Sequence, residues 1–260
     1  MIPKVGIVVP TLGTRLEYLR QCLKSIREAG DAYVLLVAPQ SFNSVKLITD
    51  GLIDGVVQDP RNGISEAINL GIMSLPPEVE FVNWLGDDDL LTKDSLAVAL
   101  DAFSSDNQTV MVFGSCDYIN SHGETIWTNK SGQWAVPLLR FGPDLVPQPG
   151  ALFRRSGFEA VGRLSSDFSW AFDFDLFIRL SKLGRLKYID RTLASFRWHP
   201  GSLSVEHRKK SVAEASAVRT SHLPRFIRPI SAVWELPVKQ ATLWAGKRVS
   251  SQARKKMQPK

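Results

Sequence analysis

Short apolar runs alternate along the chain with longer stretches in which apolar residues recur at helical spacing. The runs that we interpret as buried strands are 4–10, 32–38, 56–58, 81–85 and 110–114. The periodic stretches predict helices at 14–28, 64–74, 94–103 and 170–184. Apolar strands that alternate with amphipathic helices indicate an α/β fold with a mainly parallel sheet covered on both faces.

Turn signals mark the ends of several of these elements. Thr14 and Glu17 have the spacing of a capping box, which predicts the start of the first helix, and Gly30 is expected to end it. Residues 121–123, Ser-His-Gly, predict a hairpin turn. Four prolines within residues 137–150 predict an irregular segment, which we interpret as a substrate loop.

Composition indicates a globular protein: 44% of the 260 residues are hydrophobic. Cys22 and Cys116 lack metal-ligand spacing and read as core thiols of a reducing compartment. The first ten residues lack the basic and apolar pattern of a secretory leader, and no apolar run reaches the roughly 18 residues that a membrane-spanning helix needs, so we expect neither secretion nor membrane insertion. The expected location is therefore cytoplasmic.

Charge divides the chain near Val205. Residues 1–205 carry 19 Lys and Arg against 23 Asp and Glu, whereas residues 206–260 carry 13 against 3. The charge difference predicts a mildly acidic domain at 1–205, large enough to form an enzyme, and a basic, helical extension at 206–260. Three interpretations of the extension stay open. It forms a solvated basic surface, it docks on the body as a helical lid, or it binds the anionic inner face of a membrane peripherally. The acidic body and the lack of a recognisable nucleic-acid fold argue against nucleic acid as a partner.

The stretch NWLGDDDLL (83–91) places Asp87, Asp88 and Asp89 side by side directly behind an apolar strand. Adjacent carboxylates raise the cost of ionising one another unless a cation, helix amides or water compensate. In parallel sheets ligands gather beyond the carboxyl ends of strands, where PTLGTR (10–15) is also expected. Such an oxygen-rich site suits Mg²⁺ or Mn²⁺. Alternatively, the triplet caps the next helix, although Thr92 could do so by itself.

Two further segments carry candidate chemistry. Asp173 and Asp175 fall in the first turn of the predicted helix at 170–184. An acidic residue there commonly interacts with the helix dipole, but a carboxylate that faces a cleft could instead serve as a general base. Arg197 and His199 end the apolar stretch FRWH just before a Pro-Gly turn, where a His is also a common structural residue.

The stretch LGTRL (12–16) has a distant likeness to the glycine-rich loop of sugar nucleotidyltransferases, which cradles a triphosphate. Pro10 and Thr11 stand where that loop needs glycines. We therefore keep a nucleotidyltransferase only as an alternative.

Taken in order, six segments resemble the family-2 glycosyltransferases of the GT-A fold. They are IVVPTLGTRLEYLRQCLKSI (7–26), NGISEAINLGI (62–72), FVNWLGDDDLL (81–91), QPGALFRRSGFEAVG (148–162), FDFDLFIRLSKLG (172–184) and YIDRTLASFRWHPGSLS (188–204). The resemblance covers roughly residues 4–205. It implies a Rossmann-like sheet and an inverting transfer of a sugar from a nucleoside-diphosphate donor to an acceptor hydroxyl.

The resemblance also assigns site residues. The family's Asp-x-Asp-Asp pattern aligns its first Asp with Gly86, so Asp88 matches the metal-binding Asp, with Asp89 beside it. Asp173 matches the catalytic base, although Phe172 replaces the usual Glu. Arg-x-His matches Arg197 and His199, which help to bind diphosphate and metal. The donor-binding set that it implies is Pro10, Thr11, Arg15, Arg61, Asn62, Gly63, Asn69, Asp87 and Arg197, and the metal set is Asp88, Asp89 and His199.

One departure concerns the nucleobase. Relatives end their second strand in an Asp-rich turn, whereas this chain has VAPQSFN (37–43), so Gln40 or Asn43 would have to replace those hydrogen bonds. The sugar, base, acceptor, linkage and oligomeric state stay open, with glycans or lipid-linked glycans of the cell envelope as the expected acceptors. Two rivals come from other classes. One is a non-catalytic nucleotide-sugar or glycan-binding module, and the other is a membrane-surface interaction protein, which would explain the basic tail but not the acidic residues.

Overall fold

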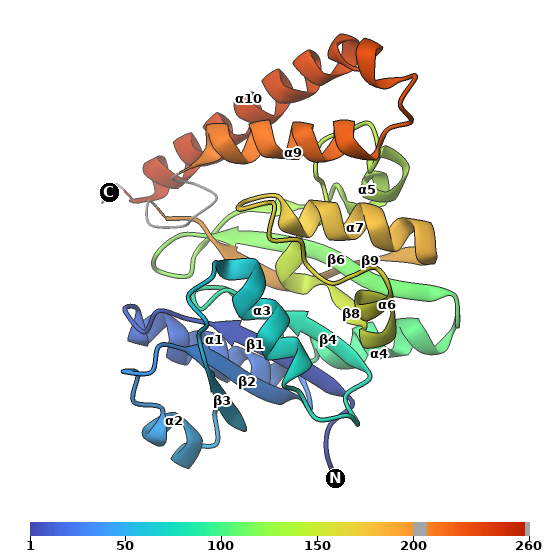
Figure 1. Cartoon of the computed structure of the whole chain (residues 1–260). Helices are drawn as coiled ribbons and strands as arrows, with labels where there is room; N and C mark the ends of the chain where they lie inside the picture. Colours follow the sequence, from blue (N-terminus) through green and yellow to red (C-terminus); the bar gives the residue numbers. More distant parts are fainter. Residues whose placement is uncertain (200–206, 258–260) are drawn as a thin grey trace.

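A mixed sheet runs through the molecule and carries helices on both faces (Figure 1). The computed structural model describes residues 1–199 and 207–257, with side chains as far as 252. Within these residues the strands are β1 Val5–Pro10, β2 Tyr33–Ala38, β3 Gly55–Gln58, β4 Phe81–Trp84, β5 Leu90–Leu91, β6 Thr109–Ile119, β7 Thr125–Asn129, β8 Leu152–Arg154 and β9 Arg185–Arg197. The helices are α1 Leu16–Ala29, α2 Val45–Thr49, α3 Ile64–Met73, α4 Ser95–Ser104, α5 Gly132–Leu138, η1 Gln148–Gly150, α6 Arg155–Ala160, α7 Phe172–Leu183, α9 Arg208–His222, η2 Arg228–Ile230 and α10 Ala232–Met257.

The strand order is β3-β2-β1-β4-β8-β6-β9-β5, with β7 paired to β6. Strands β1 to β4 are parallel, and β6 runs parallel to β9. The short strand β8 enters antiparallel between β4 and β6 and joins the two parallel parts. The predicted α/β class is therefore confirmed, and all five predicted strands are present with their bounds shifted slightly or, for β6, extended.

Two apolar layers lie on opposite faces of the sheet. One packs α3 and α7 against residues such as Val8 and Phe153, and the other packs α1 and α4 against Ile7 and Val112. Neighbouring residues of one strand serve different layers because side chains alternate across a sheet. Cys22 and Cys116 are buried free thiols, as predicted. No helix within the described residues is long and apolar enough to cross a membrane.

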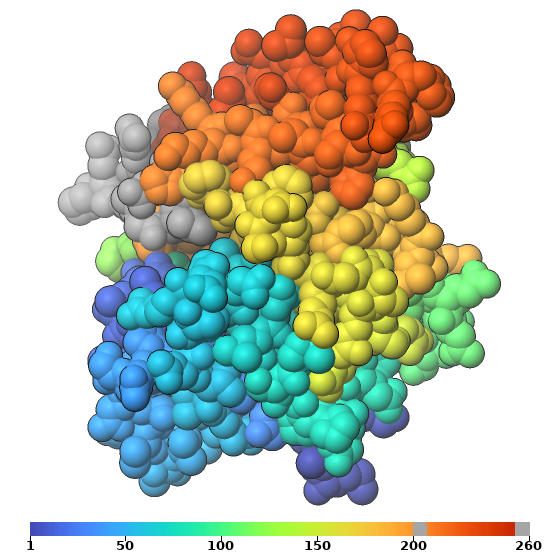
Figure 2. Space-filling model, viewed as in Figure 1, coloured from blue at the N-terminus to red at the C-terminus, as the bar shows by residue number. Residues whose placement is uncertain are grey.

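The basic C-terminal segment forms a helical pair that packs on the body. Helix α9 lies against α7, and α10 lies against α9 and β7, so the pair covers one end of the molecule (Figure 2). Arg219 donates two hydrogen bonds to Glu235, at 2.8 and 2.7 Å, and this buried ion pair ties α9 to α10. The expected domain boundary at 205/206 lies outside the described residues.

Two local predictions differ in outcome. The hairpin at 121–123 is confirmed between β6 and β7. The capping box is wrong: α1 begins at Leu16, and neither Thr14 nor another side chain caps it. Gly13 instead adopts a positive φ of 75° and turns the chain sharply ahead of the helix.

Candidate active site

The acidic triplet lies in the loop directly after β4, at the carboxyl end of the parallel strands. Each carboxylate has a different environment. Asp89 points into the protein, where its Oδ1 accepts a hydrogen bond from the backbone N–H of Arg197 at 3.0 Å. Burial raises the pKa of Asp89 well above its ordinary value, and the negative charge of Asp88 raises it further. The loop does not cap the following helix, since α4 begins after Asp94 without a side-chain cap.

Arg197 supports the triplet from behind. Its side chain is only 1% exposed. The guanidinium donates to the backbone oxygens of Asp88 and Ser121 at 2.9 and 3.2 Å and to Gln21 Oε1 at 2.9 Å. It also stacks on the ring of Tyr18, 4.4 Å from the centroid. These contacts fix the backbone of the loop, so a donor-binding role for Arg197 stays a prediction that this burial does not favour.

Asp87 and Asp88 face the open side, where Arg15 bridges them. The Arg15 guanidinium lies 2.5 Å from Asp87 Oδ1 and 2.6 Å from Asp88 Oδ2. Thr11 Oγ1 donates to Asp87 Oδ2 at 2.6 Å, and His199 Nε2 lies 2.8 Å from Asp88 Oδ2. The structure thus brings together residues that are distant in sequence and that the motifs singled out.

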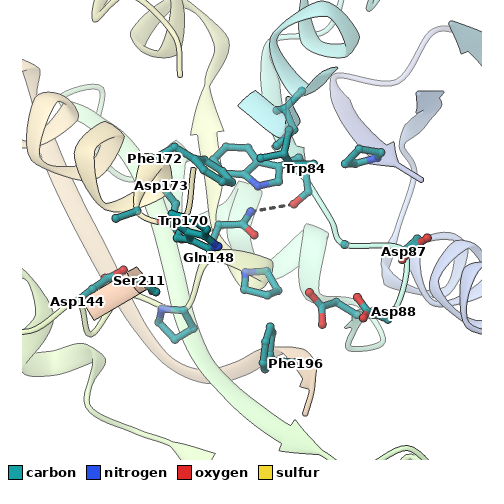
Figure 3. A pocket seen from close by; sticks show the side chains of 18 of the residues that line it. Trp84, Asp87, Asp88, Asp144, Gln148, Trp170, Phe172, Asp173, Phe196 and Ser211 are labelled. Carbon is teal, nitrogen blue, oxygen red and sulfur yellow. Dashed lines mark hydrogen bonds between the residues drawn. The ribbon is translucent and has the colours of Figure 1, made fainter. Parts of the chain in front are cut away.

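A cavity of about 1040 Å³ opens beside this cluster. Its wall comes from the ends of β1, β3, β4 and β9, from the loop at 143–149, from the start of α7 and from α9. Figure 3 shows Asp87 and Asp88 on one side of the cavity and Asp173, Phe172 and Trp170 on the other. Gln148 also lines the cavity and donates a hydrogen bond to the backbone oxygen of Trp84 at 2.9 Å. The predicted irregular loop therefore does contact the cavity.

Asp173 lies in the first turn of α7 and faces the cavity. Burial raises its pKa to about 6, although the N–H of Phe174 donates to Asp173 Oδ1 at 2.8 Å and opposes the shift. Burial also raises the pKa of Asp144, and the negative charge of Asp173 adds to that shift. Because the charge of Asp173 disfavours ionisation of Asp144, the two carboxyl groups titrate as an interacting pair.

Asp175, two residues further on, has other partners. Its two oxygens bond His222 Nε2 at 2.7 Å and Arg179 Nε at 2.8 Å. Burial alone would raise the pKa of Asp175, but these hydrogen bonds outweigh it and lower the pKa. Asp175 therefore ties α7 to α9 and does not line the cavity.

Glu214 of α9 holds the turn that leads into α7. Its carboxylate accepts hydrogen bonds from the backbone N–H groups of Ser169, Trp170 and Ala171 at 2.9, 2.6 and 2.7 Å. A carboxylate in this place satisfies donors that the helix leaves without partners and complements the helix dipole. This contact could not be predicted from the sequence, because Glu214 lies in the basic extension, which the charge pattern assigned to a region separate from the body.

The remaining candidate residues divide into two groups. Pro10, Arg61 and Gly63 line the cavity, and so does Asp59, which sequence reasoning missed. Asn62 is exposed beside them.

The second group lies off the cavity. The side chain of Asn69 exchanges two hydrogen bonds with the backbone of Leu164, at 2.9 and 3.1 Å. Gln40 and Asn43 are exposed and do not line the cavity, so they are poorly placed to replace the missing nucleobase contacts.

The side-chain oxygens and nitrogens near the triplet that could serve as metal ligands fit a divalent cation only in part. Within the described residues, no three His, Cys, Asp or Glu side chains are already grouped to hold a metal ion. Asp88 and His199 offer an oxygen and a nitrogen on the cavity side, but the Arg15 guanidinium already contacts both. Mg²⁺ commonly binds through one or two carboxylates plus substrate phosphates. Asp88 and His199 would therefore hold such a cation only if Arg15 moved away from both.

Comparisons with known proteins address the fold. No protein-family model matches the chain, and a search of curated proteins found no match. Among solved structures, TarS residues 1–349 from S. aureus aligns with a TM-score of 0.62 at 14% identity, over 90% of this chain and 71% of that one.

Two structures with bound ligands are also similar. TarS 1–349 in complex with UDP-GlcNAc aligns with a TM-score of 0.62 at 14% identity, over 87% of this chain and 69% of that one. The mannosyltransferase PcManGT from Pyrobaculum calidifontis, in complex with GDP-Man and Mn²⁺, aligns with a TM-score of 0.59 at 18% identity, over 95% and 76%. The chain thus has the GT-A fold of the family-2-like glycosyltransferases, as the motif order indicated.

Proposed function

We propose that the chain is an inverting glycosyltransferase of the family-2 type, which moves a sugar from a nucleoside diphosphate to an acceptor hydroxyl. The observation that carries the proposal is the cavity itself. It has a carboxylate pair with raised pKa values on one wall and a charge-compensated acidic loop on the opposite wall, within a GT-A fold. The similar structures that contain UDP-GlcNAc and GDP-Man support a nucleotide sugar as the donor.

Asp173 serves as the general base in this mechanism. Its ionised carboxylate accepts the proton of the acceptor hydroxyl while the oxygen forms a bond to the anomeric carbon. The bond from that carbon to the diphosphate oxygen breaks on the opposite face, which inverts the configuration. A positioned general base contributes typically about 10²–10⁴-fold to the rate.

The opposite wall binds the donor. Arg15, once released from Asp87 and Asp88, is placed to contact the diphosphate, and Thr11 and the turn at 61–63 frame the nucleoside end. Asp59 is our candidate for the nucleobase contact that Gln40 and Asn43 are badly placed to make. A Mg²⁺ or Mn²⁺ ion held by Asp88 and His199, with Asp89 behind, would supply positive charge to stabilise the departing diphosphate.

The basic C-terminal helices support a proposal for the acceptor and the location. We infer an acceptor in cell-envelope glycan or glycolipid synthesis, and a cytoplasmic protein that contacts the inner face of the membrane peripherally. The cations of 206–260 and the exposed apolar side chains of α10 support this assignment.

Donor hydrolysis tests the proposal. Purified protein is incubated with UDP- and GDP-sugars in the presence of Mn²⁺ and then with a chelator, and release of the nucleoside diphosphate is measured. We expect turnover that the chelator removes. A non-catalytic nucleotide-sugar or glycan-binding module would bind without turnover, and a nucleotidyltransferase would instead release pyrophosphate from a nucleoside triphosphate and a sugar phosphate.

A further inference from the structure

One end of the cavity is built by the C-terminal helices. Arg208, Ser211, Val212, Ala215 and Arg219 of α9 and Thr242 of α10 line it, on the side where Asp173 and Trp170 lie. Figure 3 places Ser211 beside Asp144, close to Asp173. Arg208, at the start of α9, also lies over the ring of Trp198, the residue before His199, so this end of the cavity extends from the Asp173 side toward the acidic triplet.

The guanidinium of Arg208 is packed between Trp198 and Gly246. Its guanidinium carbon lies 4.9 Å from the centroid of the Trp198 ring. On another side it lies against Gly246 of α10, where a side-chain Cβ would come within 1.6 Å of the same carbon. A glycine inside a helix is unfavourable relative to alanine. The glycine at 246 is thus the residue that leaves room for the Arg208 guanidinium.

The charge of Arg208 lacks compensation within the described side chains. Arg15 and Arg219 also line the cavity, and both pair with carboxylates. No carboxylate among the residues described, 1–199 and 207–252, pairs with Arg208, and its buried Nε has no hydrogen-bond acceptor there. Burial lowers the pKa of Arg208, which reports the unfavourable loss of water around the charge.

Trp170 is a second cavity-lining donor, and His207, just before α9, and Lys210 of α9 lie against its ring. Its indole Nε1 is buried and likewise has no acceptor among the described residues. Buried donors without partners are unfavourable, and a ligand with anionic oxygens would relieve both.

We propose that the end of the cavity under α9 is the acceptor subsite and that Arg208 binds an anionic group, phosphate or carboxylate, on the acceptor. The inference rests on the proposed function, because the subsite adjoins the general base Asp173. It adds a substrate class, which is an acceptor that carries negative charge near the reacting hydroxyl. The donor's diphosphate is the other source of phosphate, and it is expected at Arg15 and Asp88.

Anion binding without chemistry tests the subsite. Glycerol phosphate and glucuronate, each paired with its uncharged analogue glycerol or glucose, are titrated into the full chain and followed by tryptophan fluorescence or calorimetry. UDP with Mn²⁺ is titrated separately. The variants are Arg208→Gln and, as a matched control, Arg248→Gln, which removes an exposed arginine stacked on Trp244 of α10, 4.6 Å from its centroid.

We expect at least one anionic probe to bind wild type and Arg248→Gln equally, and Arg208→Gln to bind it at least about tenfold more weakly, the effect of one charge-assisted hydrogen bond. The preferred probe distinguishes phosphate from carboxylate. Gly246→Ala keeps the Arg208 charge, but its added methyl group occupies the space of the guanidinium and displaces it. This variant should therefore weaken anion binding as well. Circular dichroism checks that each variant is folded.

Three results would overturn the subsite: no anionic probe binds wild type, Arg208→Gln binds anions as tightly as Arg248→Gln, or Arg208→Gln loses UDP affinity in the same proportion. Failure of the proposed function is distinguishable. In that case donor turnover is absent, while anion binding that depends on Arg208 persists.

Discussion

Three adjacent aspartates coexist at residues 87–89 because each has a different partner. Asp87 is held by Thr11 and Arg15, Asp88 by Arg15 and His199, and Asp89 by the backbone of Arg197. Arg15 pairs with both Asp87 and Asp88, so its guanidinium supplies the positive charge that a metal ion would otherwise provide between them. The three positions should therefore respond differently to substitution.

Asp88→Asn is expected to abolish metal-dependent binding of the donor. Asp88 offers its oxygen to the cavity together with His199, and its loss removes both a ligand and a negative charge. Loss of partners beyond the direct ligands typically costs about 10–100-fold in metal affinity, so loss of a direct ligand should cost at least as much. Mn²⁺ titration followed by electron paramagnetic resonance, with a nucleoside diphosphate present, measures the effect.

Asp87→Asn is the matched variant, since Asp87 neighbours the same loop and the same Arg15. Its Mn²⁺ affinity should fall less, because Thr11 and Arg15 already use both of its oxygens. Equal Mn²⁺ affinity in wild type and Asp88→Asn would remove Asp88 from the metal site.

The raised pKa of Asp173 predicts the pH dependence of the reaction. A carboxyl group accepts a proton only when ionised, and the pKa of Asp173 in the folded protein is about 6. The value of kcat/KM should therefore fall as pH drops through about 6 and level off above it, because this ratio reports the free enzyme. The apparent pKa belongs jointly to Asp173 and Asp144. Initial rates at saturating Mn²⁺ across pH 5–8, a range that brackets about 6, measure it.

Asp173→Asn should reduce turnover by at least about 10²-fold while donor binding persists. Asp175→Asn is its comparison, since that carboxylate lies two positions away and bonds Arg179 and His222 outside the cavity. Turnover of Asp173→Asn within a few-fold of wild type would mean that another group, with Asp144 first in line, takes the proton.

At the scale of elements, the sequence predicts best what depends on local periodicity. The strands β1, β2 and β4 and the helices α3, α4 and α7 follow from apolar spacing. The pairing of β8 with both β4 and β6 does not, because a three-residue strand has almost no periodicity of its own. The capping box at Thr14 failed because the turn at Gly13 and the contacts of Arg15 set the start of α1.

Glu214→Gln tests whether α9 positions the general base. The three backbone N–H groups at 169–171 would lose a charged acceptor, which lowers the free energy of unfolding by about 1–3 kcal/mol. For a chain of this size Tm falls roughly 2–4 °C for each kcal/mol. Because the same turn leads to Asp173, kcat should also fall while KM for the donor stays the same. Differential scanning fluorimetry and steady-state kinetics measure the two effects.

Glu159→Gln provides the comparison for this element. Glu159 pairs with Arg155 on the surface of α6, at 3.0 Å, and exposed pairs contribute at most about 1 kcal/mol. A kcat for Glu214→Gln equal to that of Glu159→Gln would limit Glu214 to a structural role.

At the scale of the whole molecule, the site combines residues of the body with residues of the C-terminal extension, which the sequence analysis treated as separate regions. The motifs predicted that residues 87–89, Asp173 and His199 belong to one site, and the structure brings them to one cavity. Asp144, Glu214 and Arg208 were missed because irregular loops and a charge-biased tail carry no periodic signal. The tail is thus a wall of the cavity, so a chain ending near Val205 would lose part of its site.

The remaining prediction concerns the outer surface of the C-terminal helices. Phe226 and Val233, near the connection between α9 and α10, are 81% and 77% exposed, and several Lys and Arg residues lie close to them in the sequence. Each such cation contributes about 1 kcal/mol near an anionic leaflet. The full chain should therefore co-sediment with anionic but not neutral vesicles, and added salt should release it.

Point substitutions suit this experiment better than truncation, since they leave the cavity wall in place. The double variant Phe226→Ser/Val233→Ser should bind anionic vesicles several-fold more weakly, because it removes apolar surface that would enter the interface. Val45→Ser is the matched control: Val45 is 67% exposed, but on α2 of the acidic body. Vesicle binding that ignores lipid charge and salt, or that falls equally in the control, would argue that the basic helices serve only the fold and the cavity. Binding that depends on both would place the acceptor subsite, on the inner side of the same helix pair, next to a membrane surface.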